Sequence, residues 1–225
     1  MERKPTVIAT TRSVSNTDTG IEINKVLRNT YMLLGMTLLF SAATAGIAMA
    51  MNISQMAALV LSLVGFGLLF VVNKTADSEK GIIAVFAFTG VLGAALGPML
   101  NHYLTLSNGP QLIMQALGGT AVVFFALSAY ALTSRKDFSF MGGFLFVGMI
   151  VALIASIALM FFHAPAAQMA LSAGIVLLMS GLILFDTSRI IHGGETNYIR
   201  ATVSLYLDIY NLFIHLLALL GLSDD

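Results

Sequence analysis

The stretch from Phe138 to Phe185 reads FSFMGGFLFVGMIVALIASIALMFFHAPAAQMALSAGIVLLMSGLILF, 48 residues without one charged side chain. A membrane-spanning helix needs roughly 20 apolar residues, so this stretch is long enough for two spans. The segment from His163 to Gln168, which contains Pro165, has the turn residues that would divide them. Continuous apolar runs of this length do not fit the alternating pattern of a transmembrane barrel, so the two spans are predicted to be helices.

Two further stretches have the same character. No charge occurs in the 45 residues between Arg28 and Lys74 or in the 54 residues between Lys80 and Arg135. Turn residues divide the first at 52–55 and the second at 101–111, and another apolar segment follows at 201–222. The sequence therefore predicts an all-α polytopic membrane protein, a seven-helix bundle with helices at about 31–51, 53–72, 82–100, 111–132, 141–162, 167–191 and 201–222.

This transmembrane domain would occupy residues 25–225, and residues 1–24, rich in Thr, Ser and Asn, favour a flexible cytoplasmic tail. The composition agrees with a membrane protein, because 10% of the residues are charged and 58% are hydrophobic, against about 25% charged in soluble domains. The net charge of zero offers no basic surface for nucleic acid. The absence of cysteine excludes disulfides and thiolate chemistry.

The positive charges predict the orientation of the bundle. All eleven Lys and Arg residues fall in the N-terminal tail or in the second, fourth and sixth loops, and none in the other turns or the C-terminal tail. Loops on the cytoplasmic side carry the excess of Lys and Arg. We therefore expect a cytoplasmic N-terminus and a periplasmic C-terminus.

Two acidic residues do not lie in loops or tails. Asp186 lies near the end of the sixth expected helix and Asp208 within the seventh. Asn197, in the turn between these helices, is eleven residues from each, which places both carboxyl groups roughly 10 Å inside the cytoplasmic helix ends. Because a carboxyl group at membrane depth is costly, the pair is a candidate functional site, either a pH sensor or a cation site.

The seventh helix adds a polar stripe to this pair. Ser204, Asp208, Asn211 and His215 are spaced four, three and four residues apart and therefore share one face. Two aspartates that meet in an apolar environment would share one proton and titrate together. A structural role remains open, in which Asp186 pairs with Arg189 and Asp208 bonds to a neighbouring helix. No cofactor or metal site is predicted, apart from transient binding of a cation or a proton at the pair.

The two aspartates also raise an enzymatic alternative, an aspartyl intramembrane protease. Such enzymes carry Gly-x-Gly-Asp at the second aspartate, whereas this chain has Leu205-Tyr206-Leu207-Asp208. No Gly-x-Ser-x-Gly elbow of a serine hydrolase is present either. We therefore expect a protein that is not an enzyme.

Small residues predict close helix packing in the early spans. Ala42, Gly46 and Ala50 recur every four residues in the first helix, and Gly93 and Gly97 do so in the third. Such ridges allow two helix backbones to approach each other. Pro98 should kink or end the third helix.

Several motifs resemble the transmembrane Bax inhibitor motif family, which includes Bax inhibitor-1. The family likeness lies in the seven-span layout, Phe185-Asp186-Thr187, and Leu205-Tyr206-Leu207-Asp208-Ile209-Tyr210-Asn211-Leu212-Phe213. A bacterial branch of this family is similar at Lys25-Val26-Leu27-Arg28-Asn29-Thr30-Tyr31, Phe86-Ala87-Phe88-Thr89-Gly90, Leu117-Gly118-Gly119-Thr120-Ala121 and His192-Gly193-Gly194-Glu195-Thr196-Asn197-Tyr198-Ile199-Arg200-Ala201-Thr202.

This resemblance implies a multi-pass protein of the bacterial inner membrane that binds the membrane-anchored AAA protease FtsH and restrains its degradation of membrane proteins. The alternative that it implies is a pH-sensitive calcium or cation leak channel gated by Asp186 and Asp208. Channel-type relatives latch the aspartates with an arginine near the second helix, where this chain has Lys74. Lys74 and Arg189 are therefore the candidate latch residues.

Overall fold

The computed structural model describes residues 16–162 and 164–222, and every regular element in this part of the chain is a helix. Seven helical segments among these residues are long and apolar enough to cross a membrane, which confirms the predicted fold class. The elements in chain order are α1 (Asn16–Ala50), α2 (Gln55–Thr75), α3 (Lys80–Ala95), α4 (Gly97–Leu104), α5 (Gly109–Ser134), the 3-10 turn η1 (Ser139–Met141), α6 (Gly142–Leu159), α7 (Pro165–Ile191) and α8 (Tyr198–Leu222).

The lengths of these helices suit a bilayer. The shortest spans have 21 residues, which gives a length of about 31 Å. This length matches a hydrocarbon core of about 30 Å. Helices α3 and α4 together form one span, from Lys80 to Leu104.

The first helix begins earlier than the sequence predicts. The tail is expected to extend through residue 24, whereas α1 already begins at Asn16, so residues 16–24 are helical. Each residue added to an existing helix gains one hydrogen bond, and this segment contains no proline to stop the extension. The rest of the predicted tail, residues 1–15, lies outside the described residues.

The third span is interrupted where the sequence predicts a kink. Helix α3 ends at Ala95 and α4 begins at Gly97, with Pro98 in its first turn. The Leu96 N–H bonds to the Gly93 carbonyl at 3.0 Å, a tighter turn than that of an α-helix. Proline is tolerated in a first helical turn because its missing N–H has no partner there.

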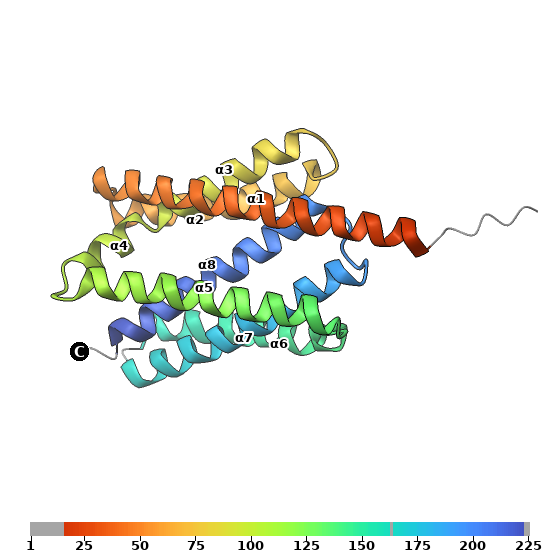
Figure 1. Ribbon diagram of the computed structural model, residues 1–225. Helices are drawn as coiled ribbons and strands as arrows, with labels where there is room; N and C mark the ends of the chain where they lie inside the picture. The colour runs from red at the N-terminus through yellow and green to blue at the C-terminus, as the bar shows by residue number, and fades with distance from the viewer. Residues whose placement is uncertain (1–15, 163, 223–225) are drawn as a thin grey trace, which may run out of the picture.

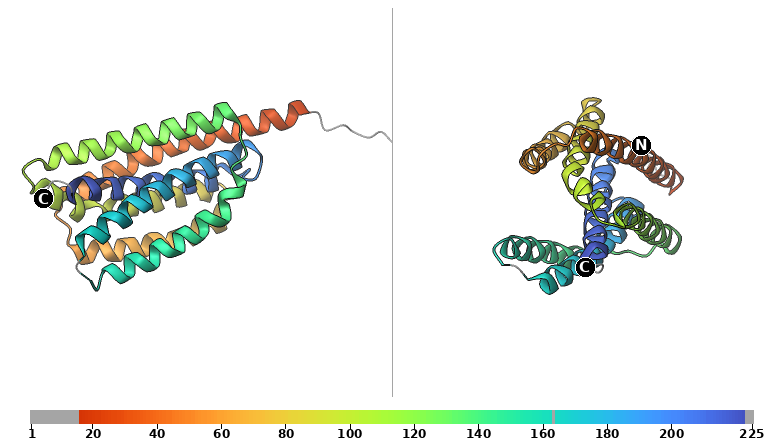
Figure 2. Two further views of the ribbon diagram at one scale, coloured as in Figure 1. Left: turned by 90° about the horizontal axis from the view of Figure 1, so that it is seen from below. Right: turned by 90° about the vertical axis from the view of Figure 1, so that its left-hand side faces the viewer.

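Helix α8 lies at the centre of the bundle (Figures 1 and 2). It contacts α1, α3, α5 and α7, and twelve of its residues are buried. The end-on view in Figure 2 shows α1 to α4 on one side of α8 and α5 to α7 on the other. Helix α6, in contrast, buries only Leu145 and exposes large apolar side chains, as a helix in contact with lipid does.

Close packing joins α1 to α3, but through a different face of α1 than the sequence predicts. A Cβ atom at Gly93 would meet the Ser41 backbone oxygen, and one at Gly97 would meet Ala48 at 2.8 Å. Gly46, expected on this ridge, has no neighbour within 4 Å of an added Cβ. Small residues line two faces of α1, and the buried face is the one that carries Ala45 and Ala48.

The start of α1 and the α2–α3, α5–α6 and α7–α8 loops all lie at one end of the bundle (Figure 1). Every Lys and Arg of the described residues belongs to these segments or to the helix ends next to them, for example Lys74, Arg135 and Arg200. The other end, with the α1–α2, α4–α5 and α6–α7 loops, carries none. The structure therefore places the described positive charges at a single membrane face.

Candidate functional site

The structure brings the two membrane-embedded aspartates together. Asp186 lies five residues before the end of α7 and Asp208 lies ten residues after the start of α8, about 8 Å and 15 Å inside these helix ends. Helices α7 and α8 pack along each other. The two carboxyl groups line one cavity, which lies beside this helix pair.

The two carboxyl groups differ in their other neighbours. Arg189, one turn along α7, places Nη1 3.6 Å from Oδ1 of Asp186, the pairing that the structural alternative predicts. Asp208 is only 4% exposed, and its Oδ2 has no hydrogen-bond partner among the described residues. Buried polar atoms are nearly always satisfied, so this orphan oxygen marks a place where a proton, water or ligand belongs.

The predicted latch residues have different positions. Arg189 reaches Asp186 and also Glu195, with 3.9 Å between Nη2 and Oε2. Lys74 is exposed in the last turn of α2 and, within the described chain, forms no ion pair with either aspartate. Of the two candidates, only Arg189 contacts the aspartate pair.

The polar stripe on α8 divides between two environments. Ser204, Asp208 and Asn211 line one cavity together with Asp186. His215 does not line this cavity, and its Nδ1 lies 3.3 Å from the Ser172 hydroxyl of α7. His215 therefore joins α8 to α7 as a helix-packing contact.

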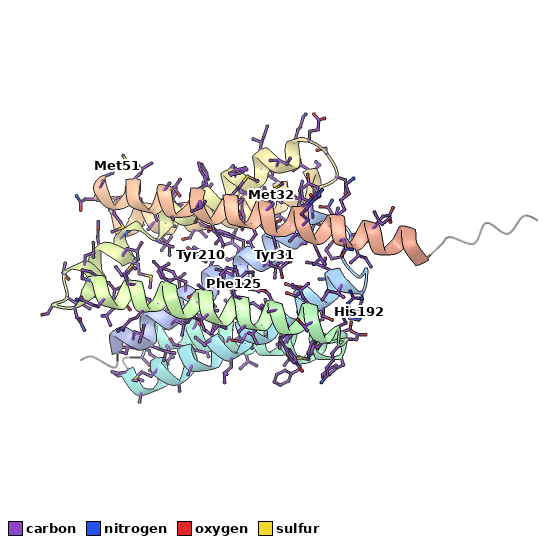
Figure 3. The ribbon with its side chains drawn as sticks, viewed as in Figure 1. Tyr31, Met32, Met51, Phe125, His192 and Tyr210 are labelled. Atoms are coloured by element: carbon purple, nitrogen blue, oxygen red, sulfur yellow. The ribbon has the colours of Figure 1, made fainter. Side chains whose placement is uncertain are left out.

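The cavity at the aspartate pair has a volume of about 560 Å³ and lies among α2, α6, α7 and α8. Its outer walls are apolar side chains of α2 and α6, including Phe66, Leu69, Ile150 and Leu153. A second cavity of about 260 Å³ lies between α1, α5 and α8, where Tyr206 and Tyr210 line it. Figure 3 labels Tyr210 in that region. It also labels Tyr31 of α1, which does not line the cavity and whose ring centroid lies 6.0 Å from that of Phe124 on α5.

A network of ion pairs and hydrogen bonds extends from Asp186 to the surface loops, and its hub is Asn197. The Asn197 Oδ1 accepts hydrogen bonds from the backbone N–H groups of Ile199 (2.8 Å) and Arg200 (3.2 Å), which caps α8. Its Nδ2 donates to the Ala76 carbonyl (2.9 Å) and to Oδ1 of Asp77 (2.8 Å) in the α2–α3 loop.

Two ion pairs complete this network. Glu195, the second partner of Arg189, accepts a hydrogen bond at 2.9 Å from the Asn197 N–H. Arg200 pairs with Asp77, with 2.6 Å between Nη2 and Oδ2. This loop contact was not predicted from the sequence, where the one available signal was an asparagine just before a helix, the residue type preferred at a helix start.

The α5–α6 loop is tied to the same end of α7. The Phe138 N–H donates to the Ser188 hydroxyl at 3.0 Å. In this loop, hydrogen bonds from the Ser139 hydroxyl and backbone N–H lower the pKa of Asp137 below its usual value. Among the described residues, no group of three His, Asp or Glu side chains could hold a metal ion.

Comparison with known proteins identifies the family. A family model described as "Inhibitor of apoptosis-promoting Bax1" matches residues 23–225. The chain belongs to the Bax inhibitor-1 family. Within this family, it is 54% identical over 205 residues to the Escherichia coli (strain K12) protein described as "Modulator of FtsH protease YccA", an alignment that covers 91% of this chain and 93% of that relative.

Other family members show a similar extent of likeness. The chain is 51% identical to an uncharacterized membrane protein of Vibrio cholerae over 94% of this chain and 95% of the relative. It is 48% identical to the uncharacterized protein PA2604 of Pseudomonas aeruginosa, over 91% and 93% respectively. A further relative from Escherichia coli, also 54% identical, is described as an inner membrane protein. The present chain, with its seven membrane-spanning helices, is likewise a multi-pass protein of the inner membrane.

Proposed function

We propose that this protein is a non-enzymatic modulator of the membrane-anchored protease FtsH and that it restrains the degradation of membrane proteins. The observation that carries the proposal is the likeness to a named FtsH modulator, at 54% identity over nearly the full length of both chains. The site agrees with a binding role, because Asp186 pairs with an arginine and the two aspartates lie beside apolar cavity walls.

The loop network suggests how such a protein could present a regulated surface. An AAA protease uses cytoplasmic ATP, so its contact with loops requires the charged end of the bundle to face the cytoplasm. The excess of Lys and Arg supports that orientation. There, Asn197 and Arg200 hold the α2–α3 loop against the α7–α8 loop, and Arg189 links the latter to Asp186.

The orientation can be tested with single cysteines, because the chain has none of its own. Cysteine at Ser78 in the α2–α3 loop should resist an impermeant thiol reagent added to the periplasmic side of spheroplasts. Cysteine at Met56, which is 69% exposed near the start of α2 at the opposite end, should react. The reverse labelling pattern would contradict the proposed topology.

The function can be tested by copurification and by substrate turnover. We expect the protein to copurify with FtsH from crosslinked native membranes, and its overexpression to slow the turnover of a membrane substrate of FtsH. A photo-crosslinker at Ser78 should capture the protease, whereas one at Met56 should not capture its AAA domain. No association in crosslinked membranes would reject the proposal.

The modulator is favoured over the two alternatives that the sequence raises. The family and the relative just named carry the descriptions of inhibitor and modulator, which favour neither a cation leak channel nor an aspartyl intramembrane protease. We therefore propose neither alternative as the function. The aspartate pair is instead a candidate pH-sensing element of the modulator.

A further inference from the structure

The cavity beside the aspartate pair combines apolar walls with a polar floor. Its volume of about 560 Å³ is within the range of small-molecule sites, roughly 300–1,000 Å³. The outer walls come from α2 and α6, whose residues Phe66 and Leu153 are 67% and 61% exposed on the lipid-facing side of the bundle. The floor is formed by Asp186, Asp208 and neighbouring polar side chains.

One carboxyl oxygen in the floor of this cavity has no hydrogen-bond donor within the described chain. Asp208 is nine-tenths or more buried, and its Oδ2 has no partner within the described chain. The nearby cation, Arg189, already pairs with Asp186 and Glu195. A buried carboxyl group without a cation is costly, so a cationic donor that enters the cavity would be stabilised there.

We propose that this cavity binds a single-chain amphiphile with a protonated amine, which enters from the lipid phase. The ammonium group is held by Asp208 and Asp186, and the alkyl chain lies along Phe66, Leu69 and Leu153. Ser204 and Asn211 offer further polar contacts beside the head group. This ligand site goes beyond the proposed function and does not depend on the protease.

Size and depth favour this class of ligand over a larger one. A transmembrane helix is about 10 Å wide and 30 Å long and occupies on the order of 2,000 Å³, which far exceeds the cavity. The amine of a phospholipid carries a phosphate, and Asp208 lies about 15 Å inside the start of α8, a depth at which a phosphate would be strongly disfavoured. An alkylamine remains protonated at neutral pH, as lysine does.

Tryptophan fluorescence provides a sharp test, because the chain has no tryptophan. Phe66→Trp places a reporter in the cavity wall, and Phe70→Trp places a control one turn further along α2, at a lipid-facing residue that does not line the cavity. Oleylamine brominated across its double bond is the quenching probe, added to the purified protein in lipid nanodiscs. Oleyl alcohol brominated in the same way is the uncharged control.

We expect saturable quenching of the Phe66→Trp reporter by the amine, and only quenching proportional to probe content for Phe70→Trp. Adding Asp208→Asn should weaken the saturable component at least tenfold, whereas Glu79→Gln, a charge removed outside the cavity, should leave it unchanged. Ser156→Phe on the peripheral helix α6 should abolish the saturable quenching, because its ring fills the cavity. This second variant keeps the test valid if Asp208→Asn perturbs the fold. Equal quenching at both reporters, or equal saturation by the alcohol, would overturn the proposal.

Discussion

Arg189 and Asp186 form an ion pair one turn apart on α7, with 3.6 Å between Nη1 and Oδ1. This contact gives one member of the aspartate pair a counter-ion and leaves the other, Asp208, without one among the described residues. Two carboxyl groups that line one cavity at membrane depth cannot both ionise without strong repulsion. In the absence of a bound amine, the geometry is therefore suited to a pair that holds one proton, most of it on the side of Asp208, and an ammonium group in the cavity would replace that proton.

We predict that this shared proton is visible in the infrared spectrum. The parent protein should show a protonated carboxyl band at about pH 7, where ordinary aspartate is fully ionised. Asp208→Asn keeps a hydrogen-bonding group and removes one charge, so the band and its pH dependence should be strongly reduced while the fold is retained. Asp208→Leu should leave Asp186 paired with Arg189 alone.

Loss of the shared proton at higher pH should restore repulsion between the two carboxylates and weaken the contact between α7 and α8. Hydrogen exchange of α7 and α8 in the parent should therefore speed up as pH rises, after correction for the intrinsic rate, and should do so much less in Asp208→Asn. A parent spectrum without any protonated carboxyl band at about pH 7 would exclude the shared proton. The aspartates would then be separate structural groups.

The second prediction concerns the loop hub Asn197. Asn197→Ala removes the cap of α8, which should lower stability by about 0.5–2 kcal/mol, and it also releases the α2–α3 loop. Asn197→Ser can still cap α8, but its side chain is too short to reach the Ala76 carbonyl. In thermal unfolding in detergent, the parent protein should therefore be the most stable, Asn197→Ser less stable and Asn197→Ala the least stable.

Hydrogen exchange can separate the two roles of Asn197. Amides at 76–80 should exchange faster in both variants, because both lose the bonds to Ala76 and Asp77. The first turn of α8 should lose protection only in Asn197→Ala. Unchanged exchange at 76–80 in both variants would mean that these bonds do not hold the two loops together.

The third prediction concerns Tyr206, a buried side chain on α8. Its hydroxyl is hydrogen-bonded to the Ser41 hydroxyl at 2.7 Å and donates to the Thr89 carbonyl at 3.2 Å, so it joins α8 to α1 and α3. Hydrogen bonds between membrane helices contribute about 0.6 kcal/mol on average and up to about 1.7 kcal/mol. Tyr206→Phe should therefore lower stability by about 1–2 kcal/mol in a denaturing-detergent titration.

Tyr210→Phe is the matched control, because this hydroxyl makes a single hydrogen bond among the described residues, to the Leu92 carbonyl at 3.2 Å. Loss of this bond should lower the stability of the protein by about half as much as Tyr206→Phe does. If both variants unfold at the same detergent fraction as the parent, the polar contacts of α8 do not contribute to the stability of the bundle. Packing of its apolar face alone would then hold it in place.

The helices and the aspartate pair were predictable from the sequence because lipid imposes simple demands on it. Each span requires an unbroken apolar run, and the equal distances of Asp186 and Asp208 from Asn197 along the chain indicated a pair on neighbouring helices, where both residues line one cavity. The shared face of Ser204, Asp208 and Asn211 also follows from helical periodicity. His215 lies outside the cavity because it is about 10 Å further along α8 than Asp208, beside Ser172.

Tertiary contacts explain what the sequence could not predict. The bond from Asn197 to Asp77 joins residues 120 positions apart, and its formation depends on how the α2–α3 and α7–α8 loops dock. The packing face of α1 was ambiguous because small residues recur on two of its faces. Only the position of α3 selects the face of Ser41 and Ala48 over that of Gly46.

The fourth prediction tests that choice of face. Gly93→Ala on α3 should be destabilising by about 1–3 kcal/mol, because its Cβ would press against the Ser41 backbone and force α1 and α3 apart. Gly46→Ala on α1 meets nothing within 4 Å and gains helix propensity, so it should be neutral or stabilising by up to about 1 kcal/mol. Denaturing-detergent titration of both variants measures the difference. If Gly46→Ala were the more destabilising of the two, α1 would pack through Gly46, and the face assigned to the α1–α3 contact would be wrong.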